Sequence, residues 1–186
     1  MSQKNYLALF AKSFNWAGFF LPKNTYNDCS KLYAFCRVLD DLADEKSSLG
    51  LRIERFNEIK NIFKKNYEQN TNQEKELDQK EHTLIIKDMI ILADNNKIKK
   101  IILDDLIQGV ESDLKLKVHL RSVKDLLVYS YKVAGTVGLM MAKILNVNDT
   151  RSLKGAIDLG IAMQLTNIAR DVIEDQKMNR QYIKPD

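Results

Sequence analysis

One stretch of the sequence, LYAFCRVLDDLADE (residues 32–45), decides how the chain folds. On a helix, residues three and four apart share a face, so this stretch separates into an apolar side and a polar side. Ala34, Leu39 and Leu42 supply apolar flanks. The polar stripe comprises Tyr33, Arg37, Asp40, Asp41 and Asp44. The pattern predicts a helix with a dense acidic stripe towards its end.

The acidic stripe gives a physical reason to expect a cation. Like charges four residues apart destabilise a helix, so the cluster of Asp40, Asp41 and Asp44 costs stability unless a cation neutralises it. We therefore interpret these three aspartates as candidate metal ligands.

A second polar stripe lies in GIAMQLTNIARDVIED (residues 160–175), within an otherwise apolar helix. Its members recur at spacings of three, four and four residues: Gln164, Asn167, Asp171 and Asp175. A solvent face would be expected to bear long Lys and Glu side chains. Short Gln, Asn and Asp side chains favour a pre-organised site. The pattern predicts a straight stripe along one continuous helix.

Together the two stripes supply two Asp-x-x-x-Asp pairs. Mg²⁺ prefers oxygen ligands and is usually held by one or two carboxylates plus waters and phosphate oxygens. Two facing helices of this kind would bracket a diphosphate through bridging metals, which would neutralise a leaving group. A single such pair is more often surface charge. Two pairs, each next to an arginine (Arg37 and Arg170), favour a metal site.

The remaining sequence predicts an all-α protein. Glycine (7) and proline (2) are scarce among the 186 residues, and no strand-like alternation stands out. We expect one domain over residues 1–186 and a surface loop in the polar run 69–79. Helices are expected near 4–20, 23–46, 50–68, 80–94, 98–117, 122–145 and 151–179.

Composition limits the partners and the compartment. The net charge of +4 is too small to argue for nucleic acid, although it suits an anionic substrate or membrane surface. Cys29 and Cys36 lie about 10 Å apart along one predicted helix, too far for a disulfide. No signal-peptide pattern and no apolar run of about 18 residues is present, so a cytoplasmic protein is expected.

Both stripes lie in motifs that resemble the squalene/phytoene synthase family, and bacterial phytoene synthases in particular. YAFCRVLDDLADE (33–45) looks like the first family signature, and QLTNIARDVIEDQKMNRQY (164–182) looks like the second. YSYKVAGTVGLM (129–140) resembles the central motif, and residues 109–113 resemble an upstream stretch that contains an aspartate. Ser13-Phe14 and Leu21-Pro22 match the N-terminal pattern, so the resemblance spans nearly the whole chain.

The resemblance implies an isoprenoid-synthase helical bundle around a central cavity, in which two prenyl diphosphates condense head to head. It implies Mg²⁺, with Mn²⁺ as the alternative. The implied metal ligands are Asp40, Asp44, Asp171 and Asp175, supported by Asp41. The implied diphosphate contacts and channel residues are Tyr33, Arg37, Gln164, Asn167, Arg180 and Tyr182. Tyr129 is implied to guide proton removal or to steady a cation.

Several alternatives stay open at this point. Gly135 and Gly138 fit either close helix packing or a kink, and Tyr129 fits a plain core position. Four phenylalanines are expected in the core or along the cavity: Phe10, Phe14, Phe19 and Phe20.

Phytoene formation from two geranylgeranyl diphosphates is the leading function. A squalene or dehydrosqualene synthase that uses farnesyl diphosphate is the alternative, and squalene formation would add NADPH. A non-catalytic scaffold or assembly relative is the alternative from another class. Family members continue with further helices, so a chain truncated after Asp186 is expected. Because the substrates and product are lipids, peripheral association with the inner face of a membrane is also expected. The oligomeric state is not predicted.

Overall fold

The computed structural model describes residues 6, 9, 11–68 and 81–183. The helix predicted over 4–20 is therefore described only in part, as α2 (Lys12–Gly18). The surface loop predicted over 69–79 lies outside the described residues.

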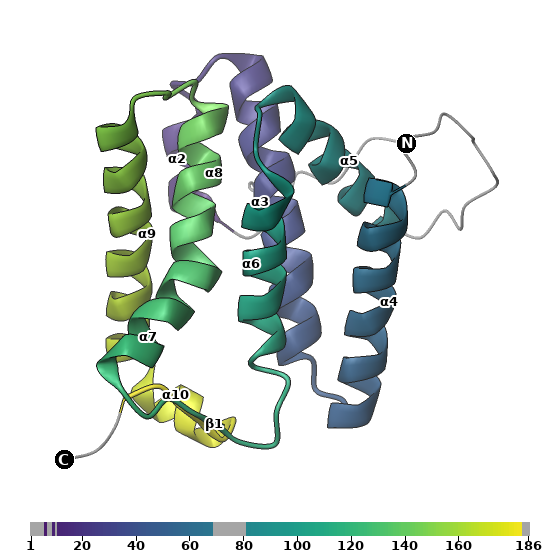
Figure 1. The fold of residues 1–186 in the computed structure, drawn as a ribbon, viewed down its shortest axis with the longest axis vertical. Helices are drawn as coiled ribbons and strands as arrows, with labels where there is room; N and C mark the ends of the chain where they lie inside the picture. Colours follow the sequence, from purple (N-terminus) through teal and green to yellow (C-terminus); the bar gives the residue numbers. More distant parts are fainter. Residues whose placement is uncertain (1–5, 7–8, 10, 69–80, 184–186) are drawn as a thin grey trace.

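Helix α3 (Lys23–Asp44) confirms the helix predicted around the first acidic stripe and lies at the centre of the bundle (Figure 1). Its apolar side is fully covered: Leu32, Phe35 and Leu39 are at most 1% exposed. The covering helices are α4 (Leu49–Glu68), α5 (Glu81–Asn95), α6 (Lys100–Glu111) and α8 (Thr136–Ile144). The burial of these apolar side chains is the main force that holds the bundle together.

The helix predicted over 122–145 is present but changes its winding. Helix α7 (Val123–Ser130) continues through a π-helical turn, η1 (Tyr131–Gly135), into α8. The hydroxyl of Thr136 donates to the carbonyl of Lys132 at 2.7 Å within this wider turn. Turns of this kind inside α-helices are often found at functional sites.

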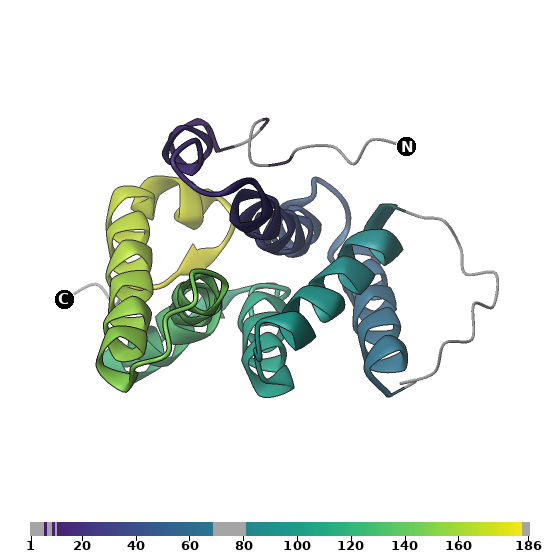
Figure 2. The same cartoon turned by 90° about the horizontal axis from the view of Figure 1, so that it is seen from above.

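Helix α9 (Thr150–Arg170) flanks the bundle and packs closely on α8 (Figure 2). A Cβ on Gly138 would lie 2.2 Å from the Ala156 carbonyl oxygen, and one on Gly160 would lie 2.3 Å from that of Ala134. Only glycine permits such an approach of two backbones. Of the two alternatives for Gly138, close packing is therefore the one observed.

The helix predicted over 98–117 ends earlier than expected. Helix α6 ends at Glu111, not near residue 117, and the chain then turns into β1 (Val118–His119). Strand β1 pairs in parallel with β2 (Arg180–Gln181), although no strand was predicted. The sequence gives no local signal for this pair because each strand has two residues and their partners are far apart in the chain.

The helix predicted over 151–179 is broken. Asp171 has φ −100° and ψ 14°, which ends α9 and precedes the short helix α10 (Val172–Lys177). The prediction of one straight stripe from Gln164 to Asp175 is therefore wrong.

Both cysteines are free, as expected. Phe14, Phe19 and Phe20 do not lie in the core, since they are 55%, 77% and 78% exposed, and Phe10 lies outside the described residues. Within residues 11–68 and 81–183, no helix is long and apolar enough to cross a bilayer.

Candidate functional site

The first aspartate motif occupies the last turns of α3. Asp40 and Asp44 lie four residues apart, on the same side of the helix. Burial raises the pKa of Asp40 to about 7, and the charge of Asp44 is the second cause of this rise. The charge of Arg37 opposes it. The Asp40 side chain itself keeps an exposed surface, so solvent weakens this effect. The pair is a site of concentrated negative charge that a cation would relieve.

Arg37 and Asp41 form a second feature of the same helix. The Arg37 guanidinium binds Asp41 through two atoms, with Nη2 at 2.7 Å and Nε at 3.1 Å. Both side chains are exposed, so the pair contributes little to stability. The half-buried Tyr33 lies one turn before Arg37, and burial is the main cause of its raised pKa. Arg37 is thus occupied by Asp41 and would have to exchange partners to bind a diphosphate.

The second motif lies on both sides of the break at Asp171. Asp171 accepts two hydrogen bonds of 2.6 Å from its neighbour Arg170, which lower its pKa. Asp175 lies on α10, and burial raises its pKa. The positive charge of Arg180 opposes this rise, whereas the negative charges of Asp171 and Asp44 add to it. Half-buried Asn167 and Gln164 precede them on α9. The mutual repulsion of Asp44 and Asp175 shows that the two motifs approach each other.

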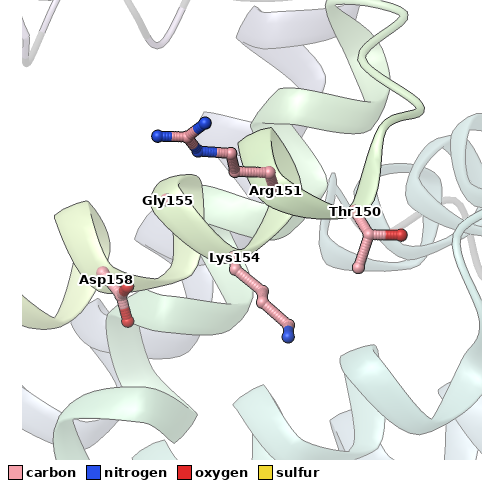
Figure 3. A pocket seen from close by; sticks show the side chains of 5 residues that line it. All are labelled: Thr150, Arg151, Lys154, Gly155 and Asp158. Carbon is pink, nitrogen blue, oxygen red and sulfur yellow. The ribbon is translucent and has the colours of Figure 1, made fainter.

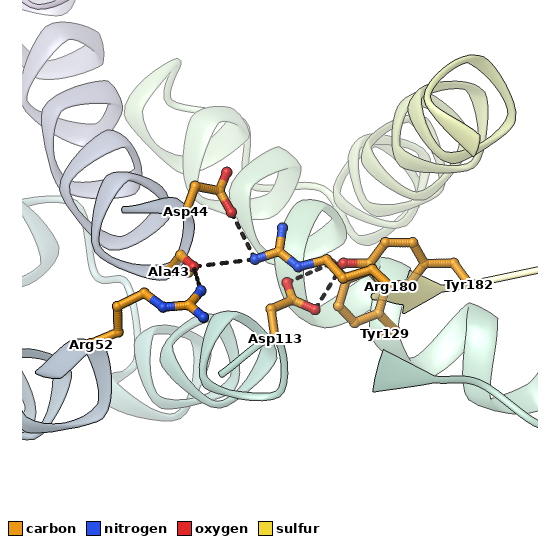
Figure 4. A network of polar contacts seen from close by, with 7 residues as sticks. All are labelled: Ala43, Asp44, Arg52, Asp113, Tyr129, Arg180 and Tyr182. Atoms are coloured by element: carbon orange, nitrogen blue, oxygen red, sulfur yellow. Dashed lines mark hydrogen bonds and ion pairs between the residues drawn. The ribbon is translucent and has the colours of Figure 1, made fainter. Parts of the chain in front are cut away.

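Arg180 contacts the end of the first motif (Figure 4). Its guanidinium contacts Asp44 at 2.7 Å and donates to the Ala43 carbonyl at 3.3 Å. The side chain is only 8% exposed. Burial alone would lower the pKa of Arg180, but Tyr182, Asp113 and Asp44 outweigh burial and raise it. Arg180 therefore remains a cation. It lies near the carboxylates of Asp44 in α3, of Asp113 in the turn after α6, and of Asp175 in α10.

A buried carboxylate and two tyrosines lie next to Arg180 (Figure 4). Asp113 accepts hydrogen bonds from Tyr129 at 2.8 Å and from Tyr182 at 2.9 Å. The two rings stack with their centroids 4.8 Å apart, and their hydroxyl oxygens are 3.1 Å apart. Burial, and then the charge of Asp113, raise the pKa of both phenols. Tyr129 and Tyr182 therefore remain neutral phenols.

Asp113 lies in the stretch 109–113 that resembles the family, but the sequence prediction gave this aspartate no role in the site. The available signal was an aspartate that follows the apolar face of a helix, since Leu106, Gly109 and Val110 are buried at preceding turns of α6. Burial raises the pKa of Asp113, while Arg180 and the two tyrosines oppose the rise. A buried aspartate at such a position requires partners, and here it has two phenols and a nearby cation.

Two depressions of the described part of the chain can be compared with the site. One of about 510 Å³ adjoins the site and includes Asp175, Arg180 and Tyr182 among its walls. The other, of about 550 Å³, lies on the first turns of α9 and is lined by Thr150, Arg151, Lys154, Gly155 and Asp158 (Figure 3). All five belong to one helix and none belongs to the predicted site. The depression beside Arg180 is therefore the relevant one.

The carboxylates of the two aspartate motifs fit Mg²⁺ in one specific way. Among the residues that the structure describes, no three Asp, Glu, His or Cys side chains converge closely enough to hold a metal ion. The Asp40–Asp44 and Asp171–Asp175 pairs each offer two carboxylates, which is the number that Mg²⁺ typically takes from a protein when phosphate oxygens complete its shell. The aspartates therefore fit a metal that arrives with a diphosphate.

Known proteins are similar to this chain over most of its length. The family model described as "Squalene/phytoene synthase" matches residues 7–184. The chain belongs to the squalene/phytoene synthase family. Its curated relatives in this family include a 15-cis-phytoene synthase of Paracoccus sp., 36% identical over 95% of the chain. Another, from Enterobacter agglomerans, is 33% identical over 93% of the chain.

Solved structures of the family share the fold. A dehydrosqualene synthase crystal structure covers 96% of this chain with a TM-score of 0.69 at 30% identity. A squalene synthase from Alicyclobacillus acidocaldarius covers 92% with a TM-score of 0.71 at 18% identity, which supports the fold alone. The all-α isoprenoid-synthase fold is thus confirmed. The chain spans 57% and 58% of the lengths of the two curated relatives above.

Proposed function

We propose that the protein is a prenyltransferase that condenses two prenyl diphosphates head to head, with phytoene formed from two geranylgeranyl diphosphates. The observation that supports this most directly is the position of Arg180, which binds Asp44 of the first motif while lying in the field of Asp175 of the second. A cation between two acidic pairs is a suitable receptor for a diphosphate with its metals.

In this proposal each group has a distinct task. Asp40, Asp44, Asp171 and Asp175 would hold Mg²⁺, which would draw negative charge from the leaving diphosphate. Arg180 would bind the same diphosphate as a fixed, buried cation. Tyr129 and Tyr182 present neutral phenols whose protons are directed to Asp113. Their remaining oxygen lone pairs would face an electron-deficient carbon. Gln164 and Asn167 would line the polar channel, and Tyr33 and Arg37 would meet the diphosphate at the first motif.

Incubation with each candidate substrate tests the reaction. The protein is supplied with Mg²⁺ and either geranylgeranyl or farnesyl diphosphate, and the hydrocarbon product is identified by mass spectrometry. We expect phytoene from geranylgeranyl diphosphate. A product formed only from farnesyl diphosphate would overturn the phytoene assignment and favour a dehydrosqualene or squalene synthase, as the name of the 30% identical structure suggests. NADPH would be added in parallel to detect squalene.

A binding experiment separates the enzyme from a non-catalytic relative. Titration calorimetry with inorganic diphosphate and Mg²⁺ should show binding that weakens at least about tenfold in Asp40→Asn and in Asp171→Asn. Asp158→Asn is the matched control, because Asp158 is an exposed aspartate on the far part of α9. Unchanged binding in both site variants would favour a scaffold.

A further inference from the structure

The ion pair between Arg180 and Asp44 uses one end of the guanidinium group. Nη2 of Arg180 lies 2.7 Å from Asp44 Oδ1 and donates to the Ala43 carbonyl at 3.3 Å. Figure 4 shows this end of the side chain turned towards the last turn of α3. Both partners lie at the C-terminal end of the helix, where the helix dipole adds negative charge. Arg180 thus places its positive charge where a carboxylate and a helix end both attract it.

The two members of this pair differ in exposure. The Asp44 side chain is 51% exposed, whereas that of Arg180 is 8% exposed. Asp44 can therefore be reached from solvent, while Arg180 lies on the inner side of the pair. A Mg²⁺ ion bound to Asp44 would lie about 2.1 Å from a carboxylate oxygen. Because two cations on one carboxylate repel each other, a metal at Asp44 would compete with Arg180.

The backbone of Arg180 is anchored, so a change of partner would involve its side chain. Strand β2 pairs with β1, and the Val118 amide donates to the Asn179 carbonyl at 3.0 Å, directly before Arg180. Asn179 has φ 58°, a left-handed conformation that asparagine adopts more readily than most residues. The Arg180 side chain lines the depression of about 510 Å³ together with Asp175. A diphosphate in this depression would offer Arg180 a second anionic partner.

The other arginines of the two motifs are bound less firmly. Arg37 and Arg170 pair with Asp41 and Asp171, and their side chains are 39% and 69% exposed. Exposed ion pairs of this kind contribute little and exchange partners at little cost. Arg180 is the buried member of the three, so its release from Asp44 should have the largest effect on binding.

We propose that Arg180 is the exchangeable counter-ion of Asp44, and that a diphosphate draws it off Asp44 so that this carboxylate becomes available to a metal. The inference rests on the proposed function, since it requires that the same site receives a diphosphate. Metal alone has to displace a buried guanidinium, whereas Asp44 is free to bind the metal that accompanies a diphosphate. Metal and diphosphate therefore bind with positive coupling, and each raises the affinity of the other by the same factor.

Metal binding without diphosphate gives the first test. Mn²⁺ is titrated into the protein, and free Mn²⁺ is measured by electron paramagnetic resonance. Arg180→Gln should bind Mn²⁺ at least about fivefold more tightly than the unmodified protein, because Asp44 no longer has a partner to give up. Inorganic diphosphate should raise the Mn²⁺ affinity of the unmodified protein at least about tenfold, and that of Arg180→Gln less than about threefold.

The matched control is Arg52→Gln. Arg52 donates to the same Ala43 carbonyl at 2.6 Å, so the variant loses the same charge nearby and leaves the Arg180–Asp44 pair in place. Its Mn²⁺ affinity should lie within about twofold of the unmodified protein. An equal gain in both variants would reduce the effect to a general loss of positive charge and overturn the proposal. Circular dichroism should show that each variant is folded.

Diphosphate binding without metal tests the other side of the exchange, with substitutions of exposed side chains. In a chelator, calorimetry should show that Asp44→Asn binds inorganic diphosphate at least about fivefold more tightly than the unmodified protein, because Arg180 is released. Asp40→Asn removes the same charge one turn earlier without releasing Arg180 and should gain less than about twofold. Equal gains in the two variants, or no gain in Asp44→Asn, would contradict the exchange.

The two experiments also separate this inference from the proposed function. Absence of diphosphate binding, with and without Mn²⁺, would overturn the proposed function. The Mn²⁺ titrations of Arg180→Gln and Arg52→Gln contain no diphosphate, so they still decide whether Arg180 competes for Asp44. Diphosphate binding without a gain in Mn²⁺ affinity in Arg180→Gln would leave the proposed function standing and overturn the exchange.

Discussion

Arg180 holds most of the charge balance of the candidate site. It is buried, it binds Asp44, and it lies in the field of Asp113 and Asp175. A buried cation with several carboxylate neighbours is compensated, whereas the carboxylates still repel one another. Removal of single residues should therefore have effects of opposite sign, depending on whether the change leaves an uncompensated charge or relieves repulsion.

Asp40→Asn should stabilise the metal-free protein at alkaline pH. The pKa of Asp40 in the fold is about 7, against about 4 in an unfolded chain, so the folded state binds more protons in between. The contribution of Asp40 to stability therefore falls as the pH rises from about 4 to about 7. Because the side chain is exposed, we expect a gain of about 1 kcal/mol, a rise in Tm of about 2–4 °C.

The measurement is thermal unfolding in a chelator at pH 8 and at pH 4. The gain should be present at pH 8 and largely vanish at pH 4, where Asp40 is protonated in the folded state and about half protonated in the unfolded chain. Asp158→Asn provides the control for loss of one exposed negative charge on the protein. A gain of equal size at both pH values would contradict the raised pKa of Asp40.

Asp113→Ala should destabilise the fold more than the loss of either tyrosine hydroxyl. The substitution leaves two buried phenols without their acceptor, at a cost of about 2–3 kcal/mol, whereas Tyr182→Phe removes one hydrogen bond worth about 1.5 kcal/mol. Urea denaturation measures both. Tyr131→Phe, whose half-buried hydroxyl binds Asp105, should cost less than about 1 kcal/mol. An Asp113→Ala loss no larger than that of this control would exclude the buried network as a source of stability.

The sequence predicted which residues belong to the site. It predicted their hydrogen-bond and ion-pair partners less well. Asp40, Asp44, Tyr129, Arg180 and Tyr182 were all recognised from motifs and lie in or beside the site. The partners of Asp113 were not predictable, because Tyr182 lies 69 residues away and the contact depends on the whole bundle. The Arg37–Asp41 pair, in contrast, follows from a spacing of four on one helix.

The packing of α9 against η1 and α8 depends on glycine at two positions. Gly138→Ala and Gly160→Ala should each destabilise the protein by about 1–3 kcal/mol, because the added Cβ would collide with a backbone carbonyl that cannot rotate away. Gly155→Ala is the matched control on α9. Its Cβ would meet nothing within 4 Å, so it should stabilise the helix by about 0.5–1 kcal/mol.

Denaturant midpoints of the three variants check the sign of each effect. Gly160 and Gly155 lie five residues apart on one helix. A lower midpoint for Gly160→Ala and a higher one for Gly155→Ala would separate the effect of packing from the effect of helix propensity. Destabilisation by Gly155→Ala would show that the exposed side of α9 is covered in solution.

Helix positions were predictable from the sequence, while the ends of α6 and α9 were not. The start of α3 follows Pro22, and the start of α9 follows Asp149, whose side chain accepts the Ser152 amide hydrogen bond. The end of α9 at Asp171 has no glycine or proline to mark it. The end of α6 depends on β1 and β2, whose pairing joins distant parts of the chain. Local propensity has no information about such tertiary requirements.

The whole molecule has an uneven distribution of buried surface. Helix α3 buries eight of its 22 residues, whereas α9, with 21 residues, buries Gly160 and Ile168. Large apolar side chains of α9 and α10 remain exposed, among them Leu159, Met163 and Ile173. Helices with few buried contacts open more readily, so α9 should be less protected than α3.

Hydrogen exchange followed by mass spectrometry measures this difference. Amides of α9 and α10 should exchange at least about tenfold faster than those in the middle of α3. Helix α8 offers an internal comparison, since it contacts both α3 and α9 and should be intermediate. Equal protection of α3 and α9 would mean that another surface covers α9 in solution.

The contact between Arg180 and the Ala43 carbonyl has a consequence for synthesis of the protein. It joins residues 137 positions apart, so it closes one of the longest loops in the structure. At typical translation rates of 5–20 residues per second, Arg180 emerges on the order of ten seconds after Ala43. During that interval α3 to α6 are available to collapse on one another, because their contacts are shorter in sequence. The nascent chain can thus form the part of its hydrophobic core that α3 to α6 supply before Arg180 reaches the first acidic motif.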